Sequence, residues 1–273
     1  MSIITISRQL AGLGDETAQE LAKLLDYRFV DKHSLEEKIK SYGVAGAKFD
    51  KYDERKPTLL ASLSQNRDDY LHYLKTAMLH EAGKGSSIFI GRGANAIFRD
   101  VPGVLSVYLV TPYEIRMERV KSYFHCDDKR ARQIINQSDN DRQGFHRYFF
   151  DIDWKDPSNY HITLNTGTFH PGTIAGSIKY LRDTLFTPEI ETQHEARLKE
   201  LTLAQQVVHR IFYEKGIPIH FLEAAVTGNT ITLFGVVNSH ALVEAAVNAA
   251  KEIAEGVDVR SGIQVVQEYS IIP

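Results

Sequence analysis

The sequence predicts an α/β protein in two parts, a doubly wound parallel sheet followed by a small α+β domain. Through residues 1–186, five short apolar runs alternate with helical segments, which is the pattern of a parallel sheet covered by helices. Residues 187–199 are polar and contain Pro188, and we expect them to form a linker. From residue 200 to residue 273 the order changes to helix, hairpin, helix and strand. These observations predict one large and one small domain.

The composition is that of a globular protein and excludes several classes. The chain has 273 residues, of which 43% are hydrophobic and 25% charged. A net charge of -3 gives no bulk attraction to nucleic acid, so no nucleic-acid partner is expected. No apolar run approaches the ~20 residues of a membrane span, and no secretory pattern opens the chain. The single Cys126 excludes an internal disulfide. We therefore expect a cytoplasmic protein without a transmembrane segment.

The chain opens with a strand, a glycine turn and a helix. Residues 3–6 form an apolar run, Gly12 and Gly14 lie in the turn, and apolar residues then recur at helical spacing over residues 18–25. In this arrangement backbone N–H groups and a helix N-terminus converge on a phosphate. Glycines let the backbone approach an anion without a side chain in between. The turn is therefore a candidate phosphate site.

The chemistry of this turn differs from that of a complete P-loop, GxxxxGK[ST]. Counting from Gly14, the first glycine position holds Gln9, the Lys position Asp15 and the hydroxyl position Glu16. Exchanging a cation for an anion turns an attraction of roughly 4 kcal/mol, at about 4 Å and an effective dielectric near 20, into a repulsion. A second interpretation is that Asp15 is simply a first-turn acid of the kind that helix starts favour. The spacing leaves both interpretations open.

The next segment predicts a second strand and two helices. Residues 27–30 are typical of a short strand that ends at Asp31, and residues 33–42 and 66–82 have helical character. Between these helices, residues 43–65 combine glycines, charges and a proline with an apolar patch. We interpret them as a substrate-side insertion or as an ordinary surface excursion.

A buried strand over residues 87–90 is followed by Gly91, Arg92 and Gly93. The carboxyl ends of strands face the ligand crevice in open α/β sheets, which makes Arg92 a candidate anion ligand. A solvated turn between strand and helix is the alternative.

Basic residues gather in the segment after the next strand, residues 104–110. Thr111 and Pro112 are expected at the N-cap and first position of one helix, and Asp127 at the N-cap of another. Two helices with inward arginines would form a lid that closes on phosphates and excludes water. A helical pair with solvated cations is the competing interpretation. The arginines concerned are Arg116, Arg119, Arg130 and Arg132.

The remaining elements complete the two parts. An acidic and basic segment over residues 138–142 and an aromatic block over residues 146–150 precede the fifth strand. The expected elements after these are a strand over residues 160–164, a helix over 171–186, a helix over 201–213, a hairpin of 224–227 and 230–236 around Gly228-Asn229, a helix over 240–255 and a strand over 263–266.

Taken together, residues 1–186 resemble the cytidylate kinase-like family, a branch of the nucleoside monophosphate kinases with a P-loop fold. The matching stretches are ITISRQ with its glycine turn, Asp31 at the end of strand two, SIFIGRGAN, VYLVTPYEIRMERV, DNDR and ITLNT. Their order and spacing make the resemblance more specific than any single motif. The stretch TGNTITLFGVVNSHALVEAAVNAAKEIAEGVDV resembles a BON domain.

The kinase resemblance implies transfer of the ATP γ-phosphoryl group to a pyrimidine monophosphate, with Mg²⁺ as the usual cation. It implies that Gly12 and Gly14 cradle the donor phosphates and that Arg92 holds the acceptor phosphate. Asp31 would lie on the acceptor side. The resemblance further implies that Arg116, Arg119, Arg130 and Arg132 neutralise the transferring charge, and that Asp139, Asp141 and Arg142 lie near the acceptor nucleotide.

Departures from the family pattern leave two functions open. Relatives usually carry a basic residue where Asp15 stands. Arg8 keeps the family's Ser-Arg pair and is a candidate replacement cation, while Thr17 is the nearby hydroxyl for Mg²⁺. One hypothesis is an active nucleoside monophosphate kinase. The other is a catalytically impaired nucleotide-binding sensor that reports to the second domain.

The BON resemblance implies a binding or regulatory role for the second domain. BON domains are associated with membrane surfaces, small ligands or partner proteins. The hairpin and helix residues here are typical of core packing, so no site is assigned within this domain.

Overall fold

The computed structural model describes residues 1–42, 66–254 and 256–266. The predicted insertion or excursion at residues 43–65 lies outside the described residues. Two compact units divide between Glu195 and Ala196. Within the described residues, no helix combines the length and the apolar character that crossing a bilayer requires.

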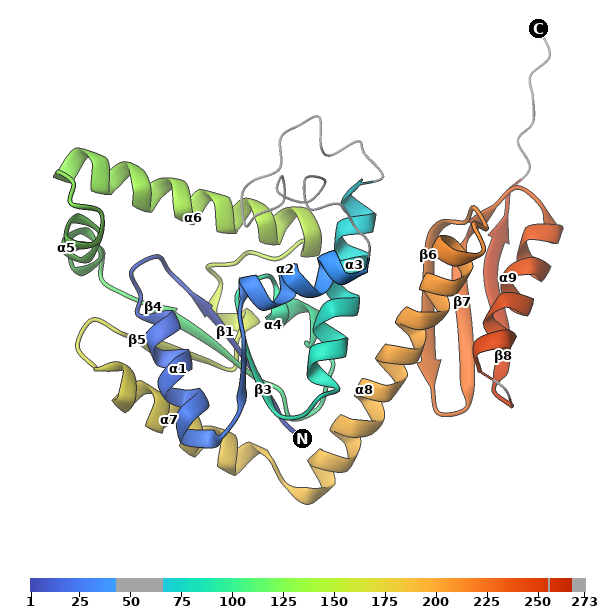
Figure 1. Cartoon of the computed structure of the whole chain (residues 1–273), viewed down its shortest axis with the longest axis horizontal. Coiled ribbons are helices and arrows are strands. Elements are labelled where there is room, and N and C mark those ends of the chain that lie inside the picture. Colours follow the sequence, from blue (N-terminus) through green and yellow to red (C-terminus); the bar gives the residue numbers. More distant parts are fainter. Residues whose placement is uncertain (43–65, 255, 267–273) are drawn as a thin grey trace, which may run out of the picture. The chain divides into compact units, whose positions relative to one another are not determined.

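The first unit is built on a five-stranded parallel sheet in the order β2-β3-β1-β4-β5 (Figure 1). The predicted doubly wound α/β class is confirmed, since every pairing is parallel and helices connect the strands. The strands are β1 (Ile3–Arg8), β2 (Arg28–Val30), β3 (Ser87–Ile90), β4 (Leu105–Val110) and β5 (Ile162–Asn165).

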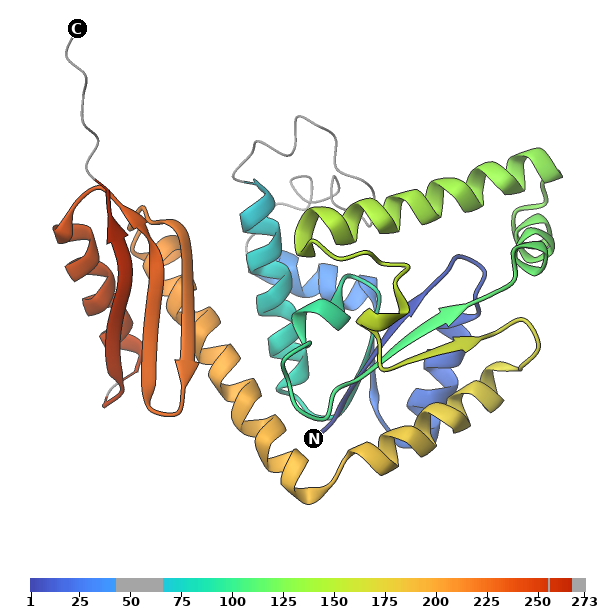
Figure 2. The same ribbon diagram turned by 180° about the vertical axis from the view of Figure 1, so that it is seen from behind.

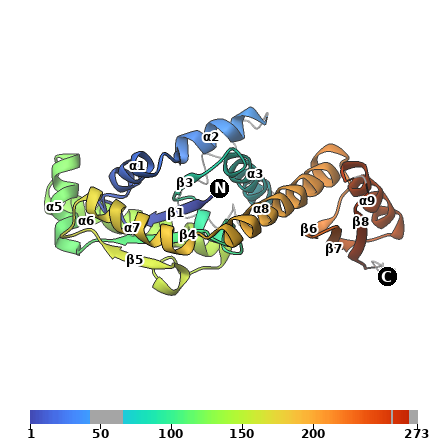
Figure 3. The same cartoon turned by 90° about the horizontal axis from the view of Figure 1, so that it is seen from below.

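Each face of this sheet buries a different set of side chains. On one face, Ile4 and Ile6 pack with Leu21 of α1 (Gly14–Leu25) and Ile178 of α7 (Pro171–Leu185). Figure 3 shows α1 and α7 running close together. The other face is aromatic: Phe89 meets Phe98, and Tyr108 stacks on Tyr160 with Trp154 at its edge. Figure 2 shows α4 (Ala94–Ile97) and the turn before β5 in front of this second face.

The segment expected as two short lid helices and a polar stretch is longer and more regular than predicted. Helix α5 (Tyr113–Phe124) is followed by the single helix α6 (Asp128–Phe150), which includes residues 138–142 and the aromatic block. Asp127 caps α6, as predicted, by accepting the Arg130 N–H at 2.8 Å. Thr111 does not cap α5; Pro112 is the N-cap residue, because the Thr111 hydroxyl is paired with the Thr166 hydroxyl. Helices α2 (Lys32–Ser41) and α3 (Asn66–Ala82) lie close to the predicted positions.

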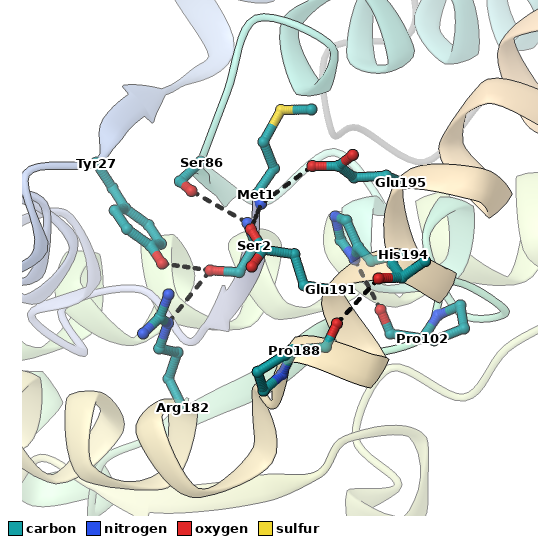
Figure 4. Close-up of polar contacts among 11 residues, drawn as sticks. Met1, Ser2, Tyr27, Ser86, Pro102, Arg182, Pro188, Glu191, His194 and Glu195 are labelled. Carbon is teal, nitrogen blue, oxygen red and sulfur yellow. Dashed lines mark hydrogen bonds and ion pairs between the residues drawn. The ribbon is translucent and has the colours of Figure 1, made fainter.

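Residues 187–199, expected as a linker, are helical from Pro188 because α8 spans Pro188–Val208. The first turns of α8 pack on the first unit (Figure 4). His194 is fully buried, and its Nδ1–H donates to the Pro102 carbonyl at 2.7 Å. Ile190 packs against Gly103, where an added Cβ would lie 2.5 Å from Ile190 Cγ2. The Met1 ammonium pairs with Glu191 and Glu195 of the same helix.

The second unit is the predicted small α+β domain. Its sheet has the order β6-β7-β8, antiparallel in the first pair and parallel in the second, and Gly228-Asn229 forms the hairpin turn. The core joins Val207 and Ile211 from the end of α8 and the following π-helical turn (His209–Glu214) to Ile231 and Leu233 of β7 and to the alanines of α9. The elements are β6 (His220–Thr227), β7 (Thr230–Val237), α9 (His240–Ile253) and β8 (Asp258–Val265).

Candidate functional site

The candidate site is built around the turn between β1 and α1. Ala11 and Leu13 are left-handed, with φ of 60° and 54°, and Leu13 is the N-cap of α1 without a side-chain hydrogen bond. The first intrahelical hydrogen bond runs from the Thr17 N–H to Leu13 O at 3.0 Å. The N–H groups of residues 14–16 come before this bond and have no carbonyl acceptor within the helix. Among the described residues, no side chain caps this helix start. The N-terminus of α1 is therefore open to hydrogen bonding by an anion.

Both glycines of the turn meet close neighbours from the chain itself. A Cβ on Gly12 would lie 2.9 Å from Gln9 O, and a Cβ on Gly14 would lie 2.4 Å from Arg8 Cγ. The stem of Arg8 therefore lies over the start of α1, which brings this predicted cation next to the turn. Asp15 is exposed in the first turn of α1.

Two predicted arginines of α5 reach the turn. Arg116 Nε donates to Leu10 O at 3.0 Å, and Arg119 Nη1 donates to Ala11 O at 2.9 Å. The other Nη of Arg119 donates to Thr166 O, after β5, at 3.0 Å. Arg116 is 3% exposed, so its charge is held inside the protein.

The charge of Arg116 is balanced by Asp139 of α6. The carboxylate accepts two parallel hydrogen bonds from the guanidinium, at 2.9 and 2.7 Å. This ion pair lies close to Tyr108, as the pKa of that phenol indicates. Burial, and then the charge of Asp139, raise the pKa of Tyr108 to about 12, while Arg116 and Arg142 oppose the rise. The structure thus brings Arg116 of α5 and Asp139 of α6 together, with Arg142 about one turn further along α6.

A pocket of about 730 Å³ lies along α6 beside the turn. It brings together the predicted residues Arg130, Asp141 and Arg142 with Leu10 of the turn and the exposed ring of Phe124. Its other lining residues are hydroxyl or amide side chains and one isoleucine: Gln133, Ile134, Asn136, Gln137, Ser138 and Asn140. Such a lining offers both hydrogen-bond donors and acceptors to a polar ligand.

Arg92 is buried in a different part of the unit. It follows β3 with φ of 55°, between two glycines that are also left-handed. Its guanidinium donates to Glu36 of α2 at 2.8 Å and to the Tyr70 hydroxyl of α3 at 3.2 Å. The side chain therefore ties α2 and α3 to the carboxyl end of β3.

Three further predicted residues differ in their surroundings. Asp31 caps α2 through Ser34: partial burial raises the pKa of Asp31, but the Ser34 N–H and hydroxyl hydrogen bonds outweigh that effect and lower it. Thr17 is fully buried, and its hydroxyl has no hydrogen-bond partner among the described residues. Arg132 is exposed on α6, away from the turn contacts described above.

Sequence reasoning missed three residues that surround the turn. Gln9 Oε1 accepts the Thr111 N–H at 2.8 Å, and the hydroxyls of Thr111 and Thr166 are paired. Gln9 stands at the first-glycine position of the P-loop comparison, which was the available signal. Thr111 and Thr166 come directly after β4 and β5, so their place at the carboxyl edge of the sheet could have been anticipated.

Models of two protein families match the two parts of the chain. The model of the cytidylate kinase-like family matches residues 3–168, and the model of the BON domain matches residues 199–267. A search among curated proteins found no match.

Solved structures resemble the first unit. An uncharacterized protein from Eubacterium ventriosum is 20% identical, with 67% of this chain and 99% of that chain covered and a TM-score of 0.53. A shikimate kinase from Aquifex aeolicus is 15% identical, with 67% and 97% covered and a TM-score of 0.37. A shikimate kinase from Acinetobacter baumannii, in complex with shikimate, is 19% identical, with 67% and 93% covered and a TM-score of 0.38.

The family match extends from the first residues of β1 to the loop after β5, and so includes the turn, the arginines of α5 and α6 and the Asp139 segment. The second match covers the whole sheet of the small unit. The chain therefore belongs to the cytidylate kinase-like family and carries a C-terminal BON domain.

Proposed function

We propose that the protein is a nucleoside monophosphate kinase that transfers the γ-phosphoryl group of ATP to a pyrimidine monophosphate. The observation that carries this proposal is the open N-terminus of α1 with the guanidinium groups of Arg116 and Arg119 bonded to the turn that precedes it. Backbone N–H groups, a helix dipole and nearby cations together favour the charged oxygens of a phosphate chain.

In the proposed reaction, an oxygen of the acceptor phosphate forms a bond to the γ-phosphorus while the bond to the β-phosphate oxygen breaks, leaving ADP. Such transfer depends mainly on positioning and on neutralising charge. The turn with Gly12 and Gly14 would hold the donor phosphates, with Arg8, whose stem lies over the start of α1, as a cation beside it. The pocket along α6, with Arg130, Asp141 and Arg142, would receive the acceptor nucleotide. Arg92 does not line this pocket, and it would hold the acceptor phosphate only by giving up its hydrogen bonds to Glu36 and Tyr70.

Mg²⁺ would accompany ATP in this proposal. Within the described residues, no group of three or more Asp, Glu, His or Cys side chains could hold a metal ion. Mg²⁺ commonly keeps several waters and binds substrate phosphates with few protein ligands. The buried, unpartnered hydroxyl of Thr17 is the candidate protein ligand.

A second candidate function is a nucleotide-binding sensor without turnover. The observation in its favour is the pair of acids in the first turn of α1. Asp15 stands where a P-loop has lysine, and Glu16 accepts a hydrogen bond from Tyr123 of α5 at 3.0 Å. Both carboxylates would repel a phosphate chain at this position.

An assay of ADP release with CMP, dCMP and UMP as acceptors separates the two functions. Turnover with any of them supports the kinase. ATP binding without turnover selects the sensor, and binding of no nucleotide would refute both. Asp15→Lys should tighten ATP binding, by up to about tenfold for an exposed charge reversal. Glu20→Lys, a charge reversal later on α1, is the matched control, and equal effects of the two variants would exclude Asp15 as the obstacle.

The BON domain is proposed to regulate the first unit or to bind a partner protein, a small ligand or a membrane surface. We place the protein in the cytoplasm, where ATP and nucleoside monophosphates are available, with nucleotides rather than nucleic acid as its ligands. The proposed division assigns residues 1–186 to the kinase-like domain and residues 200–273 to the BON domain.

A further inference from the structure

Side-chain hydrogen bonds tie the turn between β1 and α1 to the segments that follow β4 and β5. Gln9 Oε1 accepts the N–H of Thr111 at 2.8 Å, which ties the start of the turn to the end of β4. Arg119 bridges Ala11 O and Thr166 O, at 2.9 and 3.0 Å, which ties the middle of the turn to the end of β5. The turn is thus fixed to two neighbouring strand ends.

The backbone carbonyls of the turn are engaged one after another. Gln9 O accepts the Gly12 N–H at 3.1 Å, Leu10 O accepts Arg116 Nε at 3.0 Å, and Ala11 O accepts Arg119 Nη1 at 2.9 Å. In a planar trans peptide the carbonyl and the following N–H point in opposite directions. Fixing the Leu10 carbonyl therefore also fixes the direction of the Ala11 N–H, and each later peptide is constrained in turn.

The hydrogen bonds that hold the turn lower the free-energy cost of binding an anion there. Ala11 and Leu13 are non-glycine residues in the left-handed region, which costs roughly 1 kcal/mol each unless the surroundings compensate. A loop that must be ordered when a ligand binds also weakens binding by the entropy of that ordering. A turn already held by Gln9 and Arg119 avoids this second cost.

From these contacts we infer that Gln9 and Arg119 are positioning residues: they preorganise the turn so that its N–H groups are presented to the donor phosphates. Arg119 in this role acts on backbone carbonyls rather than on transferring charge, because both of its Nη groups are engaged by the turn and by Thr166. The inference rests on the proposed function for the identity of the anion. The preorganisation itself is a property of the unliganded protein.

Hydrogen exchange of the full chain without nucleotide tests the preorganisation. Gln9→Met and Arg119→Met should each accelerate exchange of the hydrogen-bonded amides of Gly12 and Thr17 by about fivefold, the effect of one lost hydrogen bond. Gln9→Glu keeps an acceptor for the Thr111 N–H and should restore protection. The matched controls are Gln193→Met and Arg99→Met, both exposed. Unchanged exchange of the Gly12 and Thr17 amides in both test variants would overturn the inference.

Calorimetric titration with ATP and, separately, with CMP tests the consequence for binding. Arg119→Met and Gln9→Met should weaken ATP binding by about fivefold and leave CMP binding unchanged, with a melting temperature within about 4 °C of that of the controls. Equal losses for ATP and CMP would overturn a positioning role for the donor turn. If the unaltered protein binds no nucleotide, the proposed function fails, while the exchange experiment still decides whether the turn is braced.

Discussion

Breaking the ion pair between Arg116 and Asp139 should destabilise the first unit strongly. Arg116 is 3% exposed, and the side chain of Asp139 is 14% exposed, so little solvent is available to screen a charge left alone. Removing one member of a buried pair typically costs 3–5 kcal/mol. Because Arg116 Nε keeps its bond to Leu10 O, we expect about 3 kcal/mol for Asp139→Ala. In a domain of this size that loss lowers the melting temperature by about 6–12 °C.

The assay is urea and thermal unfolding of Asp139→Ala beside a control on the same two helices. Lys121 and Asp128 also join α5 to α6, at 2.6 Å, but they are 41% and 72% exposed. Asp128→Ala should therefore leave the melting temperature nearly unchanged. The double variant Arg116→Met with Asp139→Leu should recover most of the lost stability, since apolar side chains can replace a buried pair. Equal small effects of Asp139→Ala and Asp128→Ala would refute the reasoning.

Two further predictions concern a buried imidazole and a glycine. Burial lowers the pKa of His194, against the opposing hydrogen bond to Pro102 and the charges of Glu195 and Glu191, while the Met1 ammonium adds to the lowering. Unfolding then takes up a proton, so the contribution of His194 to stability is full above the ordinary pKa of about 6.5 and declines as the pH falls toward the lowered pKa. Thermal unfolding between about pH 7.5 and pH 5 should show a melting temperature that falls with pH, and His194→Leu should make this fall smaller. An equal fall in both proteins would contradict the prediction. Gly93→Ala should lower the free energy of unfolding by more than about 1 kcal/mol, because φ is +71° and the new Cβ would lie 2.1 Å from the Phe150 ring. Gly176→Ala is exposed in α7 and should raise the free energy of unfolding by up to about 1 kcal/mol. Denaturant unfolding of both variants checks the sign of each change.

The architecture of the first unit was predictable because its central strands, β1, β3 and β4, are buried on both faces. The run Val104–Val110 is apolar apart from Ser106, and the glycine and proline that bound it are visible in the sequence. The start of α8 was not predicted. Its inward positions include His194, and a histidine at a core position hides the helical period. The Thr187-Pro188-Glu189 start was the remaining signal.

The pairing of side chains within the site was beyond the sequence. Arg116 and Asp139 are far apart in the chain, and the spacing shows only that each could bind a charge. Their ion pair depends on how closely α5 and α6 approach. In the same way, the engagement of Arg119 by two carbonyls depends on where β5 ends relative to the turn. Such contacts follow from the packing of elements rather than from local pattern.

The contact between Gly14 and Arg8 has a consequence for how glycine patterns are used to infer activity. Any larger residue at position 14 would collide with the Arg8 stem, whatever the turn binds. Selection for a foldable chain would preserve this glycine in a descendant that had lost phosphate transfer altogether. Conversely, the backbone keeps its shape when the lysine of a P-loop is replaced, as it is by Asp15 in this chain. The presence of this glycine therefore records architecture, and enzymatic competence has to be judged from the ionic side chains around it.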